Sequence, residues 1–310
     1  MKPNFFIVGA ARSGTSSLDR YLSQHPEIFI ASRKETHFFA RDSLPSRFTG
    51  SGDERLNQGL IRDEEQYAQL FARVTTEKAI GESSAFYLCL PGTAERIAQA
   101  LPGAKILMIL REPVERTYSA YMFLKRDGRE TLSFEEGLCQ EAARKQQGFE
   151  PMWWYKELSL YTAQVQRYLE VFGRAQVKVL LYEELFANPG RVLREVFTFL
   201  GVREDVSIDT SVRYNVSGTP RSRWLYTPLN HFIYNPSPLE KRIKSLIPLH
   251  LRKKWASRAT GMLTRPVPLE PHIHADLKEY FAEDVGKLEE LLHRDLRSWH
   301  RREPGLLQKS

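Results

Sequence analysis

The chain has 310 residues, of which 42% are hydrophobic and 27% are charged. This composition excludes a disordered or fibrous protein and fits one globular enzyme domain with a full hydrophobic core. The first apolar run starts at Phe5, and no apolar run approaches the roughly 18 residues of a membrane span. We therefore expect a soluble, cytoplasmic protein without a signal peptide.

The formal net charge is +7, from 45 basic and 38 acidic residues. Eight of the basic residues and only one acidic residue lie in the window 240–265. Such a window suits contact with an acidic glycan or a membrane surface, although a solvated helix face is the commoner origin of a charge run. No nucleic-acid-binding motif accompanies the window, so we expect no nucleic acid partner.

The most informative stretch is the N-terminal one. Phe5 to Val8 read as a short buried strand, Gly9 to Gly14 as a tight loop, and the residues from Thr15 onward as an amphipathic helix. Amide groups of a first helical turn lack intrahelical partners, and the helix dipole is positive there, so this arrangement predicts an anion cradle.

The cradle departs from the loop of kinases and NTPases, G-x-x-x-x-G-K-[ST]. The glycine spacing fits, but Thr15 stands where the lysine belongs, and a cation appears inside the loop as Arg12. Without that lysine, the usual handling of a magnesium nucleotide is lost. The loop therefore indicates an anionic group that is bound without a metal.

A carboxylate and an imidazole follow the second predicted strand, Ile28 to Ile30. If Lys34 to Phe38 is extended, Glu35 and His37 share one face because side chains alternate along a strand. Ligand sites in open α/β sheets lie at the carboxyl ends of strands, which favours a functional pair. The alternative is a charged surface loop.

The rest of the chain alternates between strand and helix patterns. We predict strands at 78–83, 105–110 and 177–182, helices at 63–73, 91–101, 113–126, 134–147, 156–172, 188–200 and 275–294, and a mobile loop at 41–63. Alternation of this kind is typical of an α/β fold with a central parallel sheet flanked by helices, here with a helical C-terminal part. We expect one domain over 1–299, with a basic helical segment at 236–265, and a flexible tail at 300–310.

Arg111 follows the clearest strand, and Ser119 lies two turns along the next helix. A forked, permanently charged guanidinium and a neutral hydroxyl suit a phosphate monoester. The alternative for Arg111 is a salt bridge at the helix end with Glu112 or Glu115.

Other residues give weaker signals. The aromatic cluster Trp153 to Tyr155 could line an acceptor pocket but is more often core. His272 and His274 have no evident third ligand, so we predict no metal site. Cys89 and Cys139 have no pairing or zinc-like spacing and are interpreted as ordinary buried thiols.

Two motifs resemble those of sulfotransferases that use PAPS (3′-phosphoadenosine 5′-phosphosulfate), in particular the bacterial and carbohydrate O-sulfotransferase branch. GAARSGTSSLDRYLSQHP, from Gly9, is similar to the family's 5′-phosphosulfate loop, and LREPVERTYSAY, from Leu110, to its 3′-phosphate segment. The resemblance implies a P-loop-like fold and transfer of a sulfuryl group from PAPS to an acceptor hydroxyl of a sugar, lipid headgroup or small metabolite. It implies 3′,5′-ADP as the second product and no metal.

The resemblance also assigns roles to residues. It implies cofactor contacts from Arg12, Ser13, Gly14, Thr15, Ser16, Ser17, Arg111 and Ser119, and, from a basic loop later in the chain, from Arg221 and Arg223. Glu35 and His37 match a Glu-x-His-Phe-Phe element whose glutamate is the general base in glycosaminoglycan O-sulfotransferases. Arg12 would stabilise charge on the oxygen that the sulfuryl group leaves.

One departure from the family pattern and three alternative functions remain. Many carbohydrate sulfotransferases have a lysine and a proline where this chain has Ser83 and Ala85. A P-loop phosphotransferase would need a lysine at Thr15, and a non-catalytic nucleotide-binding module would not need Arg12 and Glu35. Transfer from an aryl sulfate instead of PAPS would leave Arg111 without a purpose.

Overall fold

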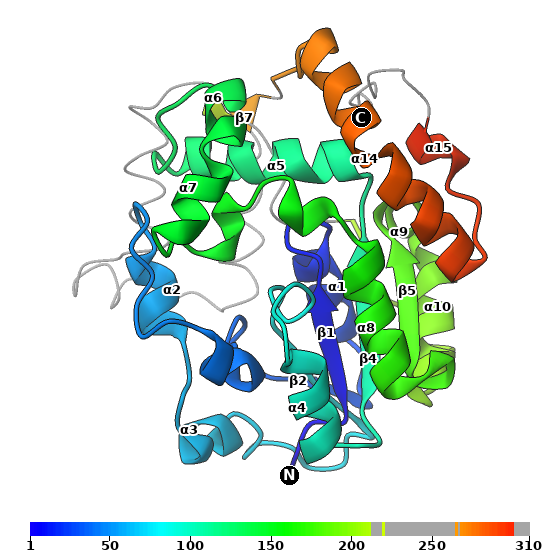
Figure 1. Ribbon diagram of the computed structural model, residues 1–310. Helices are drawn as coiled ribbons and strands as arrows, with labels where there is room; N and C mark the ends of the chain where they lie inside the picture. The colour runs from blue at the N-terminus through cyan, green and yellow to red at the C-terminus, as the bar shows by residue number, and fades with distance from the viewer. Residues whose placement is uncertain (212–218, 221–263, 266, 301–310) are drawn as a thin grey trace.

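The computed structural model describes residues 1–211, 219–220, 264–265 and 267–300 (Figure 1). Its centre is a five-stranded sheet in the order β2-β3-β1-β4-β5, in which every neighbouring pair is parallel. The strands are β1 (Phe5–Gly9), β2 (Ile28–Ile30), β3 (Ala79–Ser83), β4 (Lys105–Leu110) and β5 (Val177–Leu181). The predicted α/β class with a central parallel sheet is confirmed.

Helices flank this sheet and extend beyond it. The α-helices are α1 (Thr15–Leu22), α2 (Glu54–Gly59), α3 (Glu64–Gln69), α4 (Thr93–Ala100), α5 (Pro113–Arg126), α6 (Phe134–Cys139), α7 (Glu141–Gln146), α8 (Thr162–Phe172), α9 (Tyr182–Ala187), α10 (Pro189–Leu200), α14 (Pro271–Leu292) and α15 (Arg297–His300). The described residues also form the 3₁₀ turns η1 (Phe38–Ser43), η2 (Pro151–Trp153), η3 (Glu157–Ser159) and η4 (Arg174–Gln176). A two-residue antiparallel pair joins β6 (Thr219–Pro220) to β7 (Thr264–Arg265).

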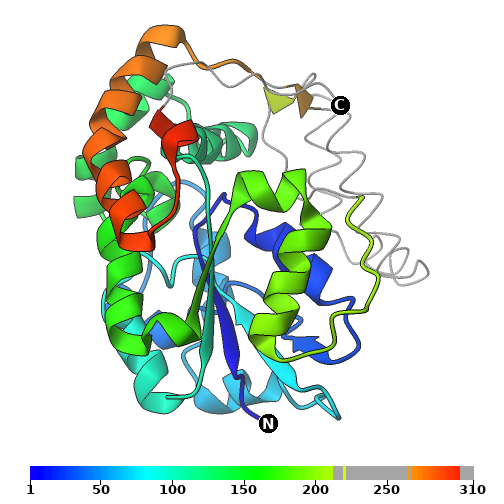
Figure 2. The ribbon, with the colours of Figure 1, turned by 90° about the vertical axis from the view of Figure 1, so that its right-hand side faces the viewer.

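Side chains at alternate positions of the central strands pack into two separate hydrophobic cores, one on each face of the sheet. Phe6 and Val8 of β1 face a large core that includes side chains of α4, α8 and α14. Phe5 and Ile7 face the opposite core, which α1 and α10 complete. Seen from the side in Figure 2, these helices form a layer on each face of the sheet. Burial on both faces explains why the strands read as continuous apolar runs.

The C-terminal helix α14 is fixed to the body by charged groups. The Asp284 carboxylate accepts a 2.7 Å hydrogen bond from the Tyr161 amide, and the Asp284 carbonyl accepts one of 2.8 Å from the Thr162 hydroxyl. The Lys278 ammonium lies 3.2 Å from the Glu112 carboxylate at the start of α5. Within the described ranges, no helix is both long and apolar enough to cross a membrane.

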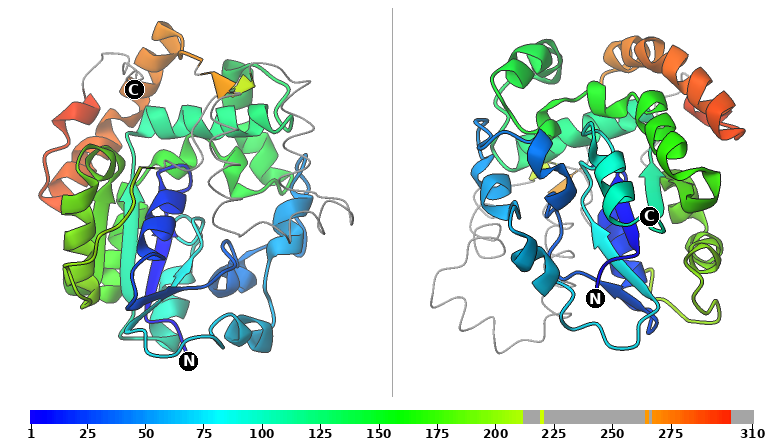
Figure 3. Two further views of the ribbon diagram at one scale, coloured as in Figure 1. Left: turned by 180° about the vertical axis from the view of Figure 1, so that it is seen from behind. Right: turned by 60° about the horizontal axis from the view of Figure 1, so that its bottom comes forward.

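Three predicted segments are wrong in detail. The helix expected over 134–147 is two helices that meet at Gln140, because the Glu141 carboxylate accepts hydrogen bonds from the amides of Lys156 and Glu157 and fixes the second helix separately. The helix expected from Lys156 begins only at Thr162, after η3. The expected loop 41–63 contains α2 and the end of η1, and it lies on the side of the molecule away from α14 and α15 (Figures 1 and 3).

Other predictions have mixed outcomes. Cys139 is exposed and Cys89 only partly buried, so the interpretation of both as buried thiols is wrong. Trp153 and Tyr155 are buried, as the core interpretation of that aromatic cluster predicts. Most of the basic segment 236–265 lies outside the described residues, as does the expected tail 300–310 except His300, which belongs to α15. The two described residues of the basic segment form β7 and not a helix.

Candidate active site

The loop that the sequence predicts as an anion cradle lies at the carboxyl end of β1. Gly14 takes the left-handed conformation (φ 96°) directly before α1, and its carbonyl accepts the first helical hydrogen bonds, from Ser17 (3.0 Å) and Leu18 (3.1 Å). Gly9 approaches a neighbouring segment closely, because a Cβ there would lie 2.7 Å from the Leu88 Cβ. The N-terminus of α1 therefore begins directly at the loop, where its dipole is positive and favours an anion.

Arg12 joins this loop to the second motif. Its Nε donates a 3.2 Å hydrogen bond to the Ser119 hydroxyl on α5, and its guanidinium carbon lies 4.7 Å from the Phe123 ring centroid. Burial and the nearby charges of Arg126 and Arg111 lower the pKa of Arg12 to about 9. Arg12 is therefore a cation at neutral pH, in a region of concentrated positive potential.

Arg111 leaves the carboxyl end of β4, beside the cradle. Its Nη2 lies 3.0 Å from the Glu115 carboxylate one turn along α5, and its guanidinium carbon lies 4.6 Å from the Tyr182 ring centroid. The salt bridge with Glu115, left open by the sequence, is therefore present. It does not exclude a role in phosphate binding, because it engages one of five N–H donors of the guanidinium.

Lys34 is a further cation of the site that the sequence reasoning missed. Its ammonium lies 3.4 Å from the Ser16 hydroxyl and 3.9 Å from the carboxylate of the buried Asp19, both on α1. It therefore lies between the cradle and the Glu35 that follows it in sequence. Its position directly before Glu35 in the sequence could have indicated this role. In the extended segment that we expected, however, Lys34 would lie on the face opposite Glu35 and His37.

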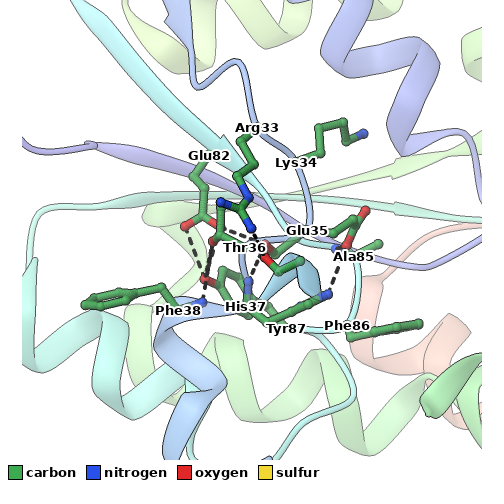
Figure 4. A network of polar contacts seen from close by, with 12 residues as sticks. Arg33, Lys34, Glu35, Thr36, His37, Phe38, Glu82, Ala85, Phe86 and Tyr87 are labelled. Atoms are coloured by element: carbon green, nitrogen blue, oxygen red, sulfur yellow. Dashed lines mark hydrogen bonds and ion pairs between the residues drawn. The ribbon is translucent and has the colours of Figure 1, made fainter. Parts of the chain in front are cut away.

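The segment carrying Glu35 and His37 is a turn and not an extended strand, which corrects the prediction. Glu35 (φ 55°) and His37 (φ 49°) both adopt the left-handed conformation. The Glu35 amide bonds to the Ser83 carbonyl (2.9 Å), and the Glu35 Oε2 accepts a hydrogen bond from the Ala85 amide (2.8 Å). The two side chains nevertheless meet, with the His37 Nε2 3.5 Å from the Glu35 Oε2 (Figure 4).

The surroundings give this pair different protonation behaviour. His37 is buried and stacks on Phe86 at a centroid distance of 5.3 Å, and burial lowers its pKa to about 3. The Glu35 side chain is 38% exposed; desolvation raises the pKa of its carboxyl, and the Lys34 charge opposes that rise. At neutral pH His37 is uncharged, and of the two only Glu35 reaches the surface of the site.

The remaining predicted residues divide into three groups. The side chains of Ser13 and Ser17 are buried, and their amides donate to the carbonyls of Ala10 (3.1 Å) and Gly14 (3.0 Å). Arg221 and Arg223 lie outside the described residues. Within the described part of the chain, no cluster of His, Cys, Asp or Glu could hold a metal ion; His272 lies 3.1 Å from the carboxylate of Glu135.

Comparison with known proteins identifies the family. The Sulfotransferase family model matches residues 3–205. This chain belongs to the sulfotransferase family. The crystal structure of a sulfotransferase from Alicyclobacillus acidocaldarius is 46% identical, covers 97% of this chain and 100% of its own, and has a TM-score of 0.78. The predicted family and the sulfotransferase fold are thereby confirmed.

Two curated relatives match this sulfotransferase over part of their length. Membrane-associated sulfotransferase kil1 of Dictyostelium discoideum is 37% identical over 149 residues, which are 45% of this chain and 28% of the relative. Human bifunctional heparan sulfate N-deacetylase/N-sulfotransferase 3 is 28% identical over 218 residues, which are 64% of this chain and 22% of the relative. The sulfotransferase therefore spans less than a third of each of these two proteins.

Proposed function

We propose that this sulfotransferase moves the sulfuryl group of PAPS to an acceptor hydroxyl, with Glu35 as the general base. The observation that carries the proposal is the meeting of three elements at one sheet edge. The cradle follows β1, Arg111 follows β4, and Glu35 is hydrogen-bonded to the segment that follows β3. An anion-binding loop, a second phosphate ligand and a carboxylate base are the parts that such a transfer needs.

The residues present fit the donor. The segment from Ser13 to Ser17 would hold the 5′-phosphate chiefly through the amides of Gly14, Thr15 and Ser16, because the Ser13 and Ser17 amides donate to the carbonyls of Ala10 and Gly14. Arg111 and the Ser119 hydroxyl would hold the 3′-phosphate, and Arg221 and Arg223 are proposed as further ligands of the nucleotide. Bound PAPS would supply an activated sulfuryl group on a phosphate leaving group.

Glu35 would accept the proton of the acceptor hydroxyl as its oxygen attacks sulfur in line with the breaking S–O bond. The acceptor oxygen gains the sulfuryl group, and the phosphate oxygen keeps the bonding electrons. Arg12 would stabilise the charge that develops on this phosphate oxygen. The neutral His37, 3.5 Å from the Glu35 carboxylate, would orient it and not act as the base.

We propose only the chemical class of the acceptor, which is a molecule with a free hydroxyl group. The likeness to a heparan sulfate N-sulfotransferase supports a carbohydrate acceptor, and a lipid headgroup or small metabolite with a hydroxyl group fits the same chemistry. The basic window 240–265 is proposed to contact an acidic glycan or a membrane surface. The likeness to a sulfotransferase named as membrane-associated supports the membrane surface as a partner of this window.

Calorimetric titration of the full chain with different nucleotides tests the proposed donor. We expect 3′,5′-ADP to bind tightly with or without magnesium, and 5′-ADP to bind weakly in both conditions. Thr15, in the place of the P-loop lysine, supports this expectation. A preference for 5′-ADP with magnesium would overturn the proposal and favour the rival phosphotransferase.

A further inference from the structure

Glu82, the penultimate residue of β3, is fully buried and surrounded by hydroxyl groups. Its Oε1 accepts hydrogen bonds from Thr36 (2.5 Å), Ser84 (2.7 Å) and Tyr87 (3.0 Å), and its Oε2 accepts one from Tyr67 (2.8 Å). The sequence reasoning attached no role to this carboxylate. Figure 4 shows it directly beside the turn that carries Glu35 and His37.

Three of the four hydroxyls connect Glu82 to the backbone of that turn. Each accepts a backbone N–H from one of three consecutive residues. The bonds run from His37 to Ser84 (3.2 Å), from Phe38 to Thr36 (3.4 Å) and from Phe39 to Tyr87 (3.1 Å). The Tyr67 hydroxyl, in contrast, contacts the carboxylate without accepting an N–H of the turn.

These bonds have a direction. A hydroxyl that accepts an N–H through its lone pair can place its own hydrogen on Glu82, so all four hydroxyls can donate to the carboxylate at once. Burial raises the pKa of Glu82, and the four donated hydrogen bonds oppose that rise. Bonds to a charged acceptor are roughly twice as strong as neutral ones, so the carboxylate strengthens each relay to the backbone.

The turn needs such support. The first N–H groups of η1 have no intrahelical acceptors, and here they are buried with the hydroxyls that receive them. Glu35 and His37 also hold left-handed conformations, which cost non-glycine residues energy and persist only where the surroundings fix them. The hydroxyl relays supply that fixation.

We infer that Glu82 is a positioning residue, which holds the Glu35–His37 turn in its active geometry through the hydroxyls of Thr36, Ser84 and Tyr87. Glu82 is fully buried, so it acts on the reaction through Glu35. The inference rests on the proposed function only in naming Glu35 as the base.

A matched pair of substitutions tests the relay. Tyr87→Phe and Tyr67→Phe each delete one hydroxyl that donates to Glu82, but only Tyr87 also receives an N–H of the turn. We expect the amides of Phe39 and its neighbours to exchange hydrogen at least about tenfold faster in Tyr87→Phe and unchanged in Tyr67→Phe. This readout needs neither donor nor acceptor, so it is independent of the proposed function. Equal effects of the two variants would overturn the inference.

Glu82→Gln tests the charge while keeping the shape of the side chain. The Glu82 carboxylate raises the pKa of Glu35, so its removal should move the acid limb of the kcat/KM profile to lower pH. We also expect kcat to fall by about tenfold or more, because a small misplacement of a reacting group is costly, while 3′,5′-ADP binds as before. An unchanged pH profile with unchanged kcat would overturn the inference. Failure of the natural protein to bind 3′,5′-ADP would overturn only the proposed function.

Discussion

The backbone amide of Ala85 donates a 2.8 Å hydrogen bond to the carboxylate of Glu35. The segment that contains Ala85 is itself bonded to β1, through the amides of Ser84 to the Ile7 carbonyl (3.1 Å) and of Leu88 to the Val8 carbonyl (2.8 Å). β1 leads directly into the anion cradle. Backbone contacts therefore fix the distance between the proposed base and the proposed donor site.

Glu35→Gln keeps the shape of the side chain and removes the proton acceptor. Because general base catalysis is worth about 10²- to 10⁴-fold, we expect kcat to fall by that order, with 3′,5′-ADP affinity unchanged. Sulfation assays with single-turnover analysis measure the first quantity, and calorimetry the second. Glu64→Gln, which makes the same change at an exposed carboxylate, is the control. Full activity of Glu35→Gln would show that another group is the base.

Lys34→Met removes a cation that lowers the pKa of Glu35. Without it the Glu35 pKa rises, so a larger fraction of the base is protonated at mildly acidic pH. We expect the acid limb of the kcat/KM profile to move to higher pH, opposite to the shift expected for Glu82→Gln. Lys145→Met, in an exposed ion pair with Glu157, is the matched control. A shift to lower pH would contradict the assigned position of Lys34.

Arg111→Ala tests the proposed 3′-phosphate ligand. Hydrogen bonds to charged groups are worth about 1.5–3 kcal/mol, so we expect 3′,5′-ADP affinity to fall about 10- to 150-fold. Affinity for 5′-AMP, which lacks the 3′-phosphate, should change little. Arg191→Ala removes an arginine from exposed ion pairs with Glu184 and Glu195 and serves as control. Equal losses for both nucleotides would indicate a general effect of charge and not recognition of the 3′-phosphate.

A buried charge cluster holds the segment before α2. The Arg129 guanidinium contacts the carboxylates of both Asp53 and Glu150, which are 0% and 5% exposed. Arg129→Ala leaves two buried acids without their cation, so we expect a loss of about 3–5 kcal/mol in the free energy of unfolding. Urea denaturation measures it. The exposed pair of Arg47 and Glu54 should contribute under about 1 kcal/mol, so Arg47→Ala is the control.

His37 predicts a pH dependence of stability. Its pKa falls from 6.5 to about 3 on folding, so between these values the unfolded chain binds more protons than the native protein. Its contribution to stability is therefore full above about pH 6.5 and declines by roughly 1.4 kcal/mol per pH unit below it, down to about pH 3. Urea unfolding from pH 7.5 to 5 should show this decline in the natural protein and a shallower one in His37→Phe. Identical slopes would mean that His37 has the same pKa in the native and the unfolded protein.

Local patterns predicted the sheet and the cradle because both depend on neighbouring residues. Continuous apolar runs marked β1 and β4, and the spacing of Gly9 and Gly14 marked the loop. The shape of the Glu35 turn could not be predicted in the same way. It depends on Glu82, which is distant in sequence, so alternation along the chain suggested an extended segment.

Lys34 and Glu82 escaped sequence reasoning for related reasons. Lys34 acquires its place from contacts with Ser16 and Asp19 on α1, across the sheet edge. Glu82 lies in an apolar strand where a carboxylate is costly, and only the four surrounding hydroxyls make its burial tolerable. Both roles exist only once segments distant in sequence have packed together.

The contrast between the two cysteines offers a practical route to following this enzyme. Cys89 is partly buried, and desolvation raises the pKa of its thiol to about 12, so it reacts more slowly with alkylating reagents than Cys139, which is exposed on α6. A maleimide dye should therefore attach preferentially at Cys139 without any engineered mutation. Fluorescence from that single probe would report ligand-induced changes around α6 in the otherwise natural chain.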